Sequence, residues 1–427
     1  MEAITDKAVY DMHLSVSMEI QLRQINDYLA AAGVDPYAVI MRFYEDGSLP
    51  VRSKEAGKAV LKNYRAAALA EAENALRSAA AFCADSGNTL TDHNTAGPAR
   101  KISRICVEKD ALKYPLTGRI LEKLGSEGED PQEIESYKDV FYNKSGYSNE
   151  TGRRLILAVR RDKLIMEGSG FCQDFGNSNF YYASCAMNCI YDCEYCYLKG
   201  MYPSDDLVIF VNIEDYFEKL REMLAGHPVY LCISYDTDLA ALEYLTGFIS
   251  KWNSFAAENN NLTLEVRSKS AAGRLWDNAP LENVIYAFTL SPDIICRMYE
   301  KAAPGLSARL SCIKEGLEKG FRVRVCFDPL LAIPDWEEEY GSVIDMLGEE
   351  PYRSGLYDLS CGTFRISSAY LKNMRKRFRS STVCQYPYEL KEGAYSYGEE
   401  LSRRMSAFVK ERLKDYFPED RIYVWNE

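Results

Sequence analysis

Short runs rich in β-branched and aromatic residues alternate with helical segments through the second half of this chain. There are six of them: Phe180–Ser184, Val229–Tyr235, Leu262–Ser268, Val284–Leu290, Phe321–Phe327 and Leu356–Ser360. Strands spaced in this way predict βα units and therefore a parallel sheet. The sequence indicates both ends of one helix, because Ser307 is a candidate N-cap and the apolar-periodic stretch stops at Gly320.

Two of these runs also alternate between apolar and polar residues. Leu264 and Val266 alternate with Glu265 and Arg267, and the run that starts at Phe321 alternates in the same way. A doubly wound sheet is covered on both faces and has continuous apolar strands, whereas a barrel with a polar interior needs alternation. The pattern favours an α/β fold, an open parallel β/α barrel of about six strands with a wet, charged interior. An edge strand or a half-exposed antiparallel sheet is the alternative.

The N-terminal part has a different character. Residues 14–32 have helical apolar spacing, and residues 54–84 are rich in good helix formers without a proline. Polar, Gly-containing stretches at 85–101 and 125–152 read as loops. We therefore expect a helical N-terminal extension over 1–150, and a barrel with a C-terminal helical segment over 151–427.

Composition sets the class of protein and its compartment. With 427 residues, 47% of them hydrophobic and 27% charged, the chain should be packed and globular rather than disordered. It has no apolar run long enough to span a bilayer and no basic, apolar leader, so we expect a cytoplasmic protein without a membrane partner. The 13 cysteines do not suggest disulfides, and with 3 histidines any metal must depend on thiolates.

The most informative stretch is Ser184–Gly200, directly after the first predicted strand. Cys189, Cys193 and Cys196 are spaced C-x3-C-x2-C, whereas a structural zinc site would show two separated pairs. Three thiolates converging on one iron-sulfur cluster leave one iron open, which can bind a small molecule and pass an electron to it. Cys185 either joins or competes for this cluster, or is a small buried residue at a strand end.

This motif, followed by an aromatic residue, resembles the signature of the radical S-adenosylmethionine (SAM) superfamily. The continuation, Cys-Glu-Tyr-Cys-Tyr-Leu at 193–198, resembles the spore photoproduct lyase family, which repairs a methylene-bridged thymine dimer in DNA. The resemblance runs from about residue 165 to the C-terminus and excludes the N-terminal helices. It implies a 4Fe-4S cluster, S-adenosylmethionine, a 5'-deoxyadenosyl radical, and an external electron donor such as flavodoxin or ferredoxin.

The resemblance also suggests roles for individual residues. It puts Tyr197 in radical return and Tyr195 within the cluster loop, although a Tyr-rich chain also uses tyrosines for packing. Thr237 and Lys269 fall where a hydroxyl and a lysine lie near S-adenosylmethionine, and a lysine at the end of a barrel strand suits a carboxylate. Asp328 is expected to accept hydrogen bonds from ribose hydroxyls.

One departure from the family pattern concerns the hydrogen donor. The family has a cysteine at the end of the second strand, in the form C-T-S-D, that returns a hydrogen atom to the product radical. The aligned residues here are Tyr235-Asp236-Thr237-Asp238. Cys232 is near, but a shift of three residues in a strand reverses the face of the side chain unless a bulge intervenes. Either Tyr235 donates the hydrogen atom or the substrate is not the thymine dimer.

Charge bears on nucleic-acid binding. The formal charge is -12, and residues 335–350 are strongly acidic, so that segment should face away from DNA. Residues 372–379 form a basic run without an acid, and residues 52–77 add more Lys and Arg. Such a patch can bind DNA on an acidic protein, or can be a solvated helix face. Two alternatives stay open: radical chemistry on a peptide or small metabolite, and a non-catalytic iron-sulfur or zinc protein that binds nucleic acid.

Overall fold

The computed structural model describes residues 2–85, 102–125, 130–142, 153–170 and 172–425. Its contacts divide the chain into two compact units. The helical unit comprises Met1–Thr91, Ala332–Trp336 and Ile366–Leu401, and the barrel unit comprises Asp92–Leu331, Glu337–Arg365 and Ser402–Glu427. The boundary expected near residue 150 thus differs from this division, in which residues 366–401 group with the N-terminal helices.

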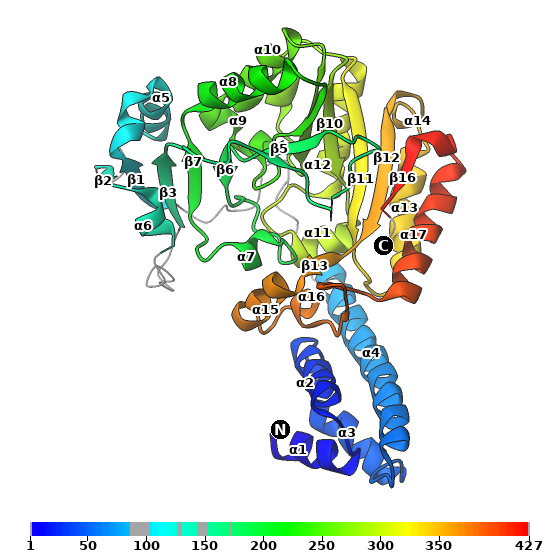
Figure 1. Cartoon of the computed structure of the whole chain (residues 1–427). Helices are drawn as coiled ribbons and strands as arrows, with labels where there is room; N and C mark the ends of the chain where they lie inside the picture. The colour runs from blue at the N-terminus through cyan, green and yellow to red at the C-terminus, as the bar shows by residue number, and fades with distance from the viewer. Residues whose placement is uncertain (1, 86–101, 126–129, 143–152, 171, 426–427) are drawn as a thin grey trace. The chain divides into compact units, whose positions relative to one another are not determined.

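The barrel unit is built on an eight-stranded sheet with the order β16-β12-β11-β10-β9-β8-β5-β4 (Figure 1). Neighbouring strands are parallel except at β4, which is antiparallel to β5. The strands are β4 Ile165–Glu167, β5 Phe180–Ala183, β8 Val229–Cys232, β9 Leu262–Ser268, β10 Val284–Thr289, β11 Arg322–Leu330, β12 Asp358–Thr363 and β16 Ile422–Val424. Each of the six predicted runs overlaps one strand, although β11 and β12 extend three residues beyond the predicted ends, and this confirms the open parallel β/α barrel. The short edge strands β4 and β16 were not expected.

Helices connect the parallel strands. They are α8 Ile213–Leu224, α9 Leu239–Thr246, α10 Phe248–Ala257, η3 Gly273–Asp277, α11 Asp293–Tyr299, α12 Leu306–Glu318, α13 Trp336–Leu347, α14 Tyr352–Gly355, α17 Glu399–Lys414 and η4 Glu419–Arg421. The predicted N-cap at Ser307 is wrong, because α12 begins at Leu306 with Gly305 as its N-cap. Gly320 does follow its C-terminus, with a φ of 82° that favours glycine.

A second sheet, with the order β2-β1-β3-β7-β6, belongs to the same unit. Its strands are β1 Ile102–Glu108, β2 Gln132–Ile134, β3 Arg153–Ala158, β6 Ala186–Met187 and β7 Leu207–Phe210, with η1 Lys109–Lys113, α5 Pro115–Leu124, α6 Tyr137–Phe141 and α7 Leu198–Met201 beside them. The segment expected to be helical up to residue 150 therefore also contains β1 and β2. Strand β1 pairs with β3, beyond the expected boundary, and β2 pairs with β1, so local sequence alone did not indicate them.

The helical unit contains α1 Glu2–Asp11, α2 Val16–Ala31, α3 Pro36–Glu45 and α4 Lys54–Asp85, as expected for the first 90 residues. From the C-terminal half come α15 Ser368–Arg377, α16 Thr382–Gln385, β14 Glu389–Lys391 and β15 Ala394–Ser396, with β13 Arg365–Ser367 pairing in the same small sheet. Tyr28 packs edge-on against Tyr386 at 5.3 Å, and Arg65 donates to the carbonyl of Pro387 at 2.9 Å. These contacts join the two sequence segments into one unit.

The polar face of β9 and β11 points inward, as the alternation predicted, and its charges neutralise one another. Glu265, fully buried, accepts hydrogen bonds from Arg324 at 2.5 Å, from Arg267 and from the Tyr230 hydroxyl. Arg324 also donates to Asp358 at 2.6 Å. Burial alone would raise the pKa of Glu265, but Arg267 and Arg324 outweigh it and lower that pKa. The network thus links four strands through ionised groups.

The chain between β4 and β5 packs against this network. Phe175 lies in one apolar cluster with Phe180 and Tyr230, and the Arg324 guanidinium is 3.3 Å from its ring centre. The carbonyl of Gln173 accepts a hydrogen bond from Arg267 at 3.1 Å. We call residues 172–178 the inner loop. Its position depends on the buried ion pairs.

Replacing Arg324 should therefore destabilise the barrel unit. In Arg324→Met the carboxylate of Asp358 loses its main cation and that of Glu265 loses one of its two, and removing one partner of a buried ion pair costs about 3–5 kcal/mol. Urea unfolding followed by circular dichroism measures the loss. Arg322→Met, at a half-buried arginine of the same strand without an acidic partner in the described residues, is the control and should cost under about 1 kcal/mol. Equal effects of the two substitutions would contradict a special role for the network.

Candidate active site

The predicted site residues gather at one edge of the main sheet. The cysteine stretch follows β5, Tyr235 and Thr237 follow β8, Lys269 follows β9, and Asp328 lies near the end of β11. The carboxyl ends of parallel strands meet at the same edge, which is where β/α barrels carry their active sites. The structure thus brings together residues that are up to 140 or so positions apart.

The cysteine loop, residues 188–197, runs between β6 and α7. Asn188 and Asp192 have left-handed backbones, with φ of 67° and 55°, which turn the chain around the cysteines. The Asn188 amide donates to the carbonyls of Ser204 and Asp206 at 2.8 and 2.7 Å. Arg153 donates to the carbonyl of Cys189 at 2.8 Å. Side-chain hydrogen bonds to the backbone therefore hold this irregular segment in place.

The three thiols of the loop lie in buried or half-buried surroundings. Cys193 is buried, and Cys189 and Cys196 pack against a buried apolar cluster. Burial raises the pKa of all three, that of Cys189 to about 12, so the thiolates need a neighbouring positive charge such as iron. Among the described residues no three Cys, His, Asp or Glu side chains surround one point as ligands of a single ion. A 4Fe-4S cluster takes one thiolate per iron, so its cysteine ligands lie farther apart than the ligands of a single metal ion.

Cys185 is placed apart from this loop. It is fully buried in the short link between β5 and β6, and its carbonyl accepts a hydrogen bond from the amide of Phe210 at 3.0 Å. Burial raises the pKa of its thiol to about 12, opposed by the Trp252 indole beside it. These contacts agree with the packing role considered for it.

Tyr195 is anchored by a buried ion pair that the sequence did not reveal. Its hydroxyl donates to Glu300, which also accepts from Ser291 at 2.9 Å and pairs with Arg309. Both charged side chains are fully buried. Burial alone would raise the pKa of Glu300, but the charges of Arg309 and Lys269 outweigh it and lower it to about 2. The backbone amide of Glu194 also donates to the carbonyl of Tyr299 at 2.8 Å, so the loop is fastened to α11.

A thiol lies against the residue that replaces the family's donor cysteine. Cys172, from the inner loop, donates to the Tyr235 hydroxyl with a sulfur-to-oxygen distance of 3.3 Å. The Tyr235 ring packs on Tyr182 and Tyr197, with ring centres 4.2 and 5.8 Å away, and Tyr197 donates to the Tyr235 carbonyl at 2.6 Å. Sequence reasoning missed Cys172 because it precedes the motif and contacts Tyr235 only through the fold.

Two polar side chains near the cysteine loop are suited to a polar ligand. Thr237 is 7% exposed, and its hydroxyl oxygen has no hydrogen-bond partner in the described part of the chain. The Lys269 ammonium lies 5.5 Å from the ring centre of Tyr195. Between them Asp238 caps α9 and accepts from Ser268 and from the backbone of Lys269, which ties the ends of β8 and β9 together. Buried hydroxyls without partners fit a bound molecule such as S-adenosylmethionine.

Asp328 is placed differently from the expected ribose contact. Its two carboxylate oxygens accept from the Arg365 guanidinium at 2.9 and 3.1 Å. This bidentate ion pair uses both oxygens. The expected contact to a ribose is therefore in competition with Arg365.

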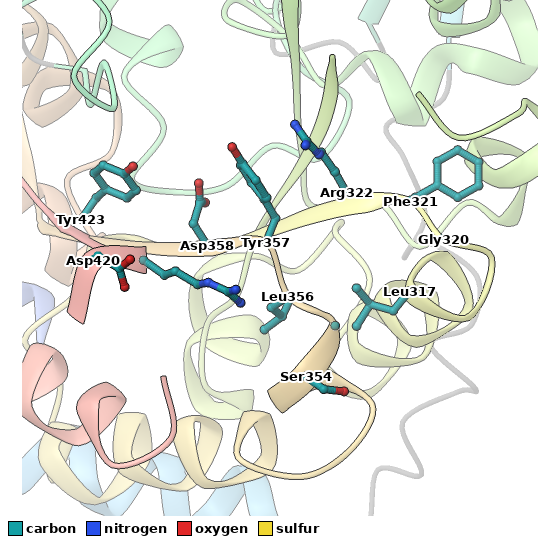
Figure 2. A pocket seen from close by; sticks show the side chains of 12 residues that line it. Leu317, Gly320, Phe321, Arg322, Ser354, Leu356, Tyr357, Asp358, Asp420 and Tyr423 are labelled. Atoms are coloured by element: carbon teal, nitrogen blue, oxygen red, sulfur yellow. The ribbon is translucent and has the colours of Figure 1, made fainter. Parts of the chain in front are cut away.

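Two cavities of the barrel unit are lined by different sets of residues. One, of about 600 Å³, is lined by the inner loop with Cys172, by Gly168 to Gly170, and by Trp425. The other, of about 480 Å³, is lined by Arg322 and Tyr357 at the amino ends of the strands, as Figure 2 shows. Only the first cavity reaches the residues around Tyr235.

The open parallel barrel, with three cysteines in a loop at its carboxyl edge, defines the radical SAM class of enzymes. The model of the spore photoproduct lyase family matches residues 101–425, and the chain therefore belongs to that family, whose cofactors are a 4Fe-4S cluster and S-adenosylmethionine. The match begins well before residue 165, where the resemblance in sequence was expected to start.

Solved structures agree with this assignment at the level of the fold. A spore photoproduct lyase complexed with dinucleoside spore photoproduct matches with a TM-score of 0.62 and 20% identity, over 76% of this chain and 98% of that one. A variant of that enzyme with bound AdoMet and the same dinucleoside matches with a TM-score of 0.61 and 18% identity, over the same shares. No curated protein matches the chain. In the described residues, no helix is long and apolar enough to cross a membrane.

Cluster loading should separate the cysteines of the loop from Cys185. After anaerobic reconstitution with iron and sulfide, we expect about four iron atoms per wild-type chain and less than about one in Cys193→Ala. Cys185→Ala should keep its iron, because that thiol is held in packing away from the loop. Iron analysis and the visible absorption band measure the outcome. Loss of iron in both variants would make Cys185 a ligand as well.

Proposed function

We propose that this enzyme reductively cleaves S-adenosylmethionine at a 4Fe-4S cluster and uses the radical to repair a methylene-bridged thymine dimer in DNA. The observation that carries the proposal is the thiol of Cys172 against the hydroxyl of Tyr235. The sequence lacks the donor cysteine at its usual place, which argued against the lyase reaction. A thiol from another segment answers that objection.

In this proposal Cys189, Cys193 and Cys196 would hold the cluster. When bound, it would supply the electron for cleavage of S-adenosylmethionine, and an external donor such as flavodoxin or ferredoxin would replace that electron. The ammonium of Lys269 suits the carboxylate of the methionine moiety, and the buried hydroxyl of Thr237 can hydrogen-bond to the same molecule. Glu300 and Arg309 position Tyr195 and thereby the loop between two of the ligands.

The substrate radical fragments, and the hydrogen atom must then be returned to the product. The S–H bond of Cys172 breaks and a C–H bond forms on the product, which leaves a sulfur-centred radical. Tyr235 gives its hydroxyl hydrogen atom to that sulfur and becomes a phenoxyl radical. The balance would close with the Tyr235 phenoxyl taking back, from 5'-deoxyadenosine, the hydrogen atom first removed from the substrate, which would restore the phenol and the 5'-deoxyadenosyl radical. Tyr197, the last residue of the cysteine loop, donates to the Tyr235 carbonyl and is a phenol packed next to that of Tyr235.

The surroundings of this pair favour the hydrogen-bearing forms. Burial raises the pKa of the Cys172 thiol and of the Tyr235 phenol above their ordinary values. Both groups therefore keep their hydrogen at neutral pH, which a hydrogen-atom donor requires. Cys232 lies in the same apolar cluster but is fully buried, whereas Cys172 lines a cavity.

Basic residues in the helical unit support a nucleic-acid substrate. Lys372, Lys376 and Arg379 are exposed and spaced for one face of α15 and its C-terminal end. Arg375 is not available for DNA, because it donates to the carbonyls of Cys384 and Tyr386 at 2.9 and 2.8 Å. In the predicted basic run, Lys372, Lys376 and Arg379 are thus exposed to solvent, whereas Arg375 is used in packing.

The decisive experiment uses the reconstituted enzyme with S-adenosylmethionine, dithionite and dinucleoside spore photoproduct. In a single turnover in D2O, wild-type enzyme should return solvent deuterium to the repaired thymine. Cys172→Ala should lower the repair rate at least about tenfold, or about 1.4 kcal/mol of barrier, and should raise the ratio of 5'-deoxyadenosine to repaired thymine. Mass spectrometry and chromatography measure both. Cys232→Ala, which removes the neighbouring thiol, is the matched control and should behave as wild type.

Two results would overturn parts of the proposal. Normal repair and deuterium return by Cys172→Ala would remove the thiol from the mechanism. Formation of 5'-deoxyadenosine by the wild type without repair of the dinucleoside would reject the DNA lesion as substrate and favour a peptide or small metabolite. A stable cluster without any cleavage of S-adenosylmethionine would favour the non-catalytic alternative.

A further inference from the structure

We infer that Trp425, held by Arg365, is the platform on which a base of the nucleic-acid substrate stacks, opposite the hydrogen donor Cys172. The inference rests on the proposed function and names a binding element that the sequence did not suggest. Three observations support it: the packing of Arg365 on the Trp425 ring, the glycine next to this pair, and the cavity that Trp425 and Cys172 both line.

The indole of Trp425 is held at the carboxyl edge of the sheet by its neighbours. The Arg365 guanidinium lies 4.0 Å from the centre of the indole ring, and Arg365 is itself fixed by Asp328 at 2.9 and 3.1 Å. The amide of Trp425 donates to the carbonyl of Cys361 at 2.9 Å. A rigid aromatic ring loses little conformational entropy when a ligand binds to it.

Gly362 allows this arrangement. A Cβ atom at this position would lie 2.9 Å from Arg365 Nη1, 3.2 Å from the Cβ of Trp425 and 3.4 Å from a carboxylate oxygen of Asp328. Any larger residue would push the three side chains apart. The backbone thus leaves room for a cluster of Asp, Arg and Trp at the carboxyl ends of the strands.

The cavity beside Trp425 has the size and the lining of a base pocket. Its volume of about 600 Å³ lies in the usual range for small-ligand sites. Trp425 and Cys172 both line it, so a base stacked on the indole is held in the cavity that the thiol faces. The small residues Gly168 and Gly170 widen it, and the side-chain amide of Gln173 offers a donor and an acceptor to the edge of a base. Asn177 offers its side-chain carbonyl, since its amide nitrogen donates to the carbonyls of Asp174 and Phe175.

The charge of the cavity favours a base over a phosphate. Glu167 and Asp174 also line it, and carboxylates repel a phosphodiester. Stacking on an aromatic ring needs no particular charge and is the usual way in which proteins hold an unpaired base. The geometry points to an extruded pyrimidine in the cavity, with the phosphates outside it.

Binding experiments with matched variants test this inference. The reconstituted enzyme is titrated by calorimetry with two probes, dinucleoside spore photoproduct and undamaged thymidylyl-thymidine. Trp425→Leu, which keeps an apolar side chain without a π face, should weaken binding of the first probe about tenfold or more. Trp425→Phe should stay within about threefold of wild type. In turnover, Trp425→Leu should raise KM for the dinucleoside more than it lowers kcat.

The second arginine–aromatic pair of the barrel unit provides the control. Arg322 lies 4.7 Å from the ring centre of Tyr357 at the opposite edge of the sheet, in the cavity drawn in Figure 2. Tyr357→Leu removes a comparable exposed ring that the inference does not use. Binding of the dinucleoside by this variant should equal that of wild type.

The outcomes separate the inference from the proposed function. Equal binding by wild type, Trp425→Leu and Trp425→Phe would overturn the platform while leaving lesion repair intact. Equal weakening in Trp425→Leu and Tyr357→Leu would show a general loss of structure and also overturn it. Wild-type enzyme that cleaves S-adenosylmethionine but binds neither probe would reject the nucleic-acid substrate itself.

Discussion

The buried ion pairs of Arg324 with Glu265 and Asp358 are the interaction on which the rest of the barrel unit depends. Charges taken out of water are tolerated only when they are paired and hydrogen-bonded, and this network satisfies its members across four strands. Phe175 stacks on Arg324, so the network also positions the inner loop. That loop in turn carries Cys172 to Tyr235. A structural network below the site therefore decides which thiol the site contains.

A second buried ion pair has the corresponding role at the carboxyl edge. Glu300 and Arg309 fasten Tyr195, and with it the cysteine loop, to the helix after β10. The two networks hold different segments: one holds the loop of the candidate cluster ligands, and the other holds the inner loop with the candidate hydrogen donor. The division suits a radical enzyme, because radical generation and hydrogen return must occur in one site without side reactions between them.

Much of the fold could be predicted from the sequence, since the strand-like runs and their polar alternation reflect local periodicity. The misses have physical reasons. The strands β1, β2 and β16 are stabilised by pairing with distant strands, and the N-cap of α12 is Gly305 rather than Ser307. The sequence predicted those residues of the candidate site that lie in a motif of closely spaced residues. Glu300, Arg309 and Trp425 reach it from separate segments and show no pattern of spacing.

The sequence by itself determined the class of this protein, because three cysteines in one short motif after a strand, within alternating strands and helices, are read locally. It also determined that the usual donor position holds a tyrosine, Tyr235. Only the tertiary structure decided that Cys172 lies 3.3 Å from that tyrosine and that Trp425 lines the same cavity. These contacts join residues far apart in the chain. They depend on how the strands of the barrel pack around the buried charges, so no single segment of the sequence predicts them.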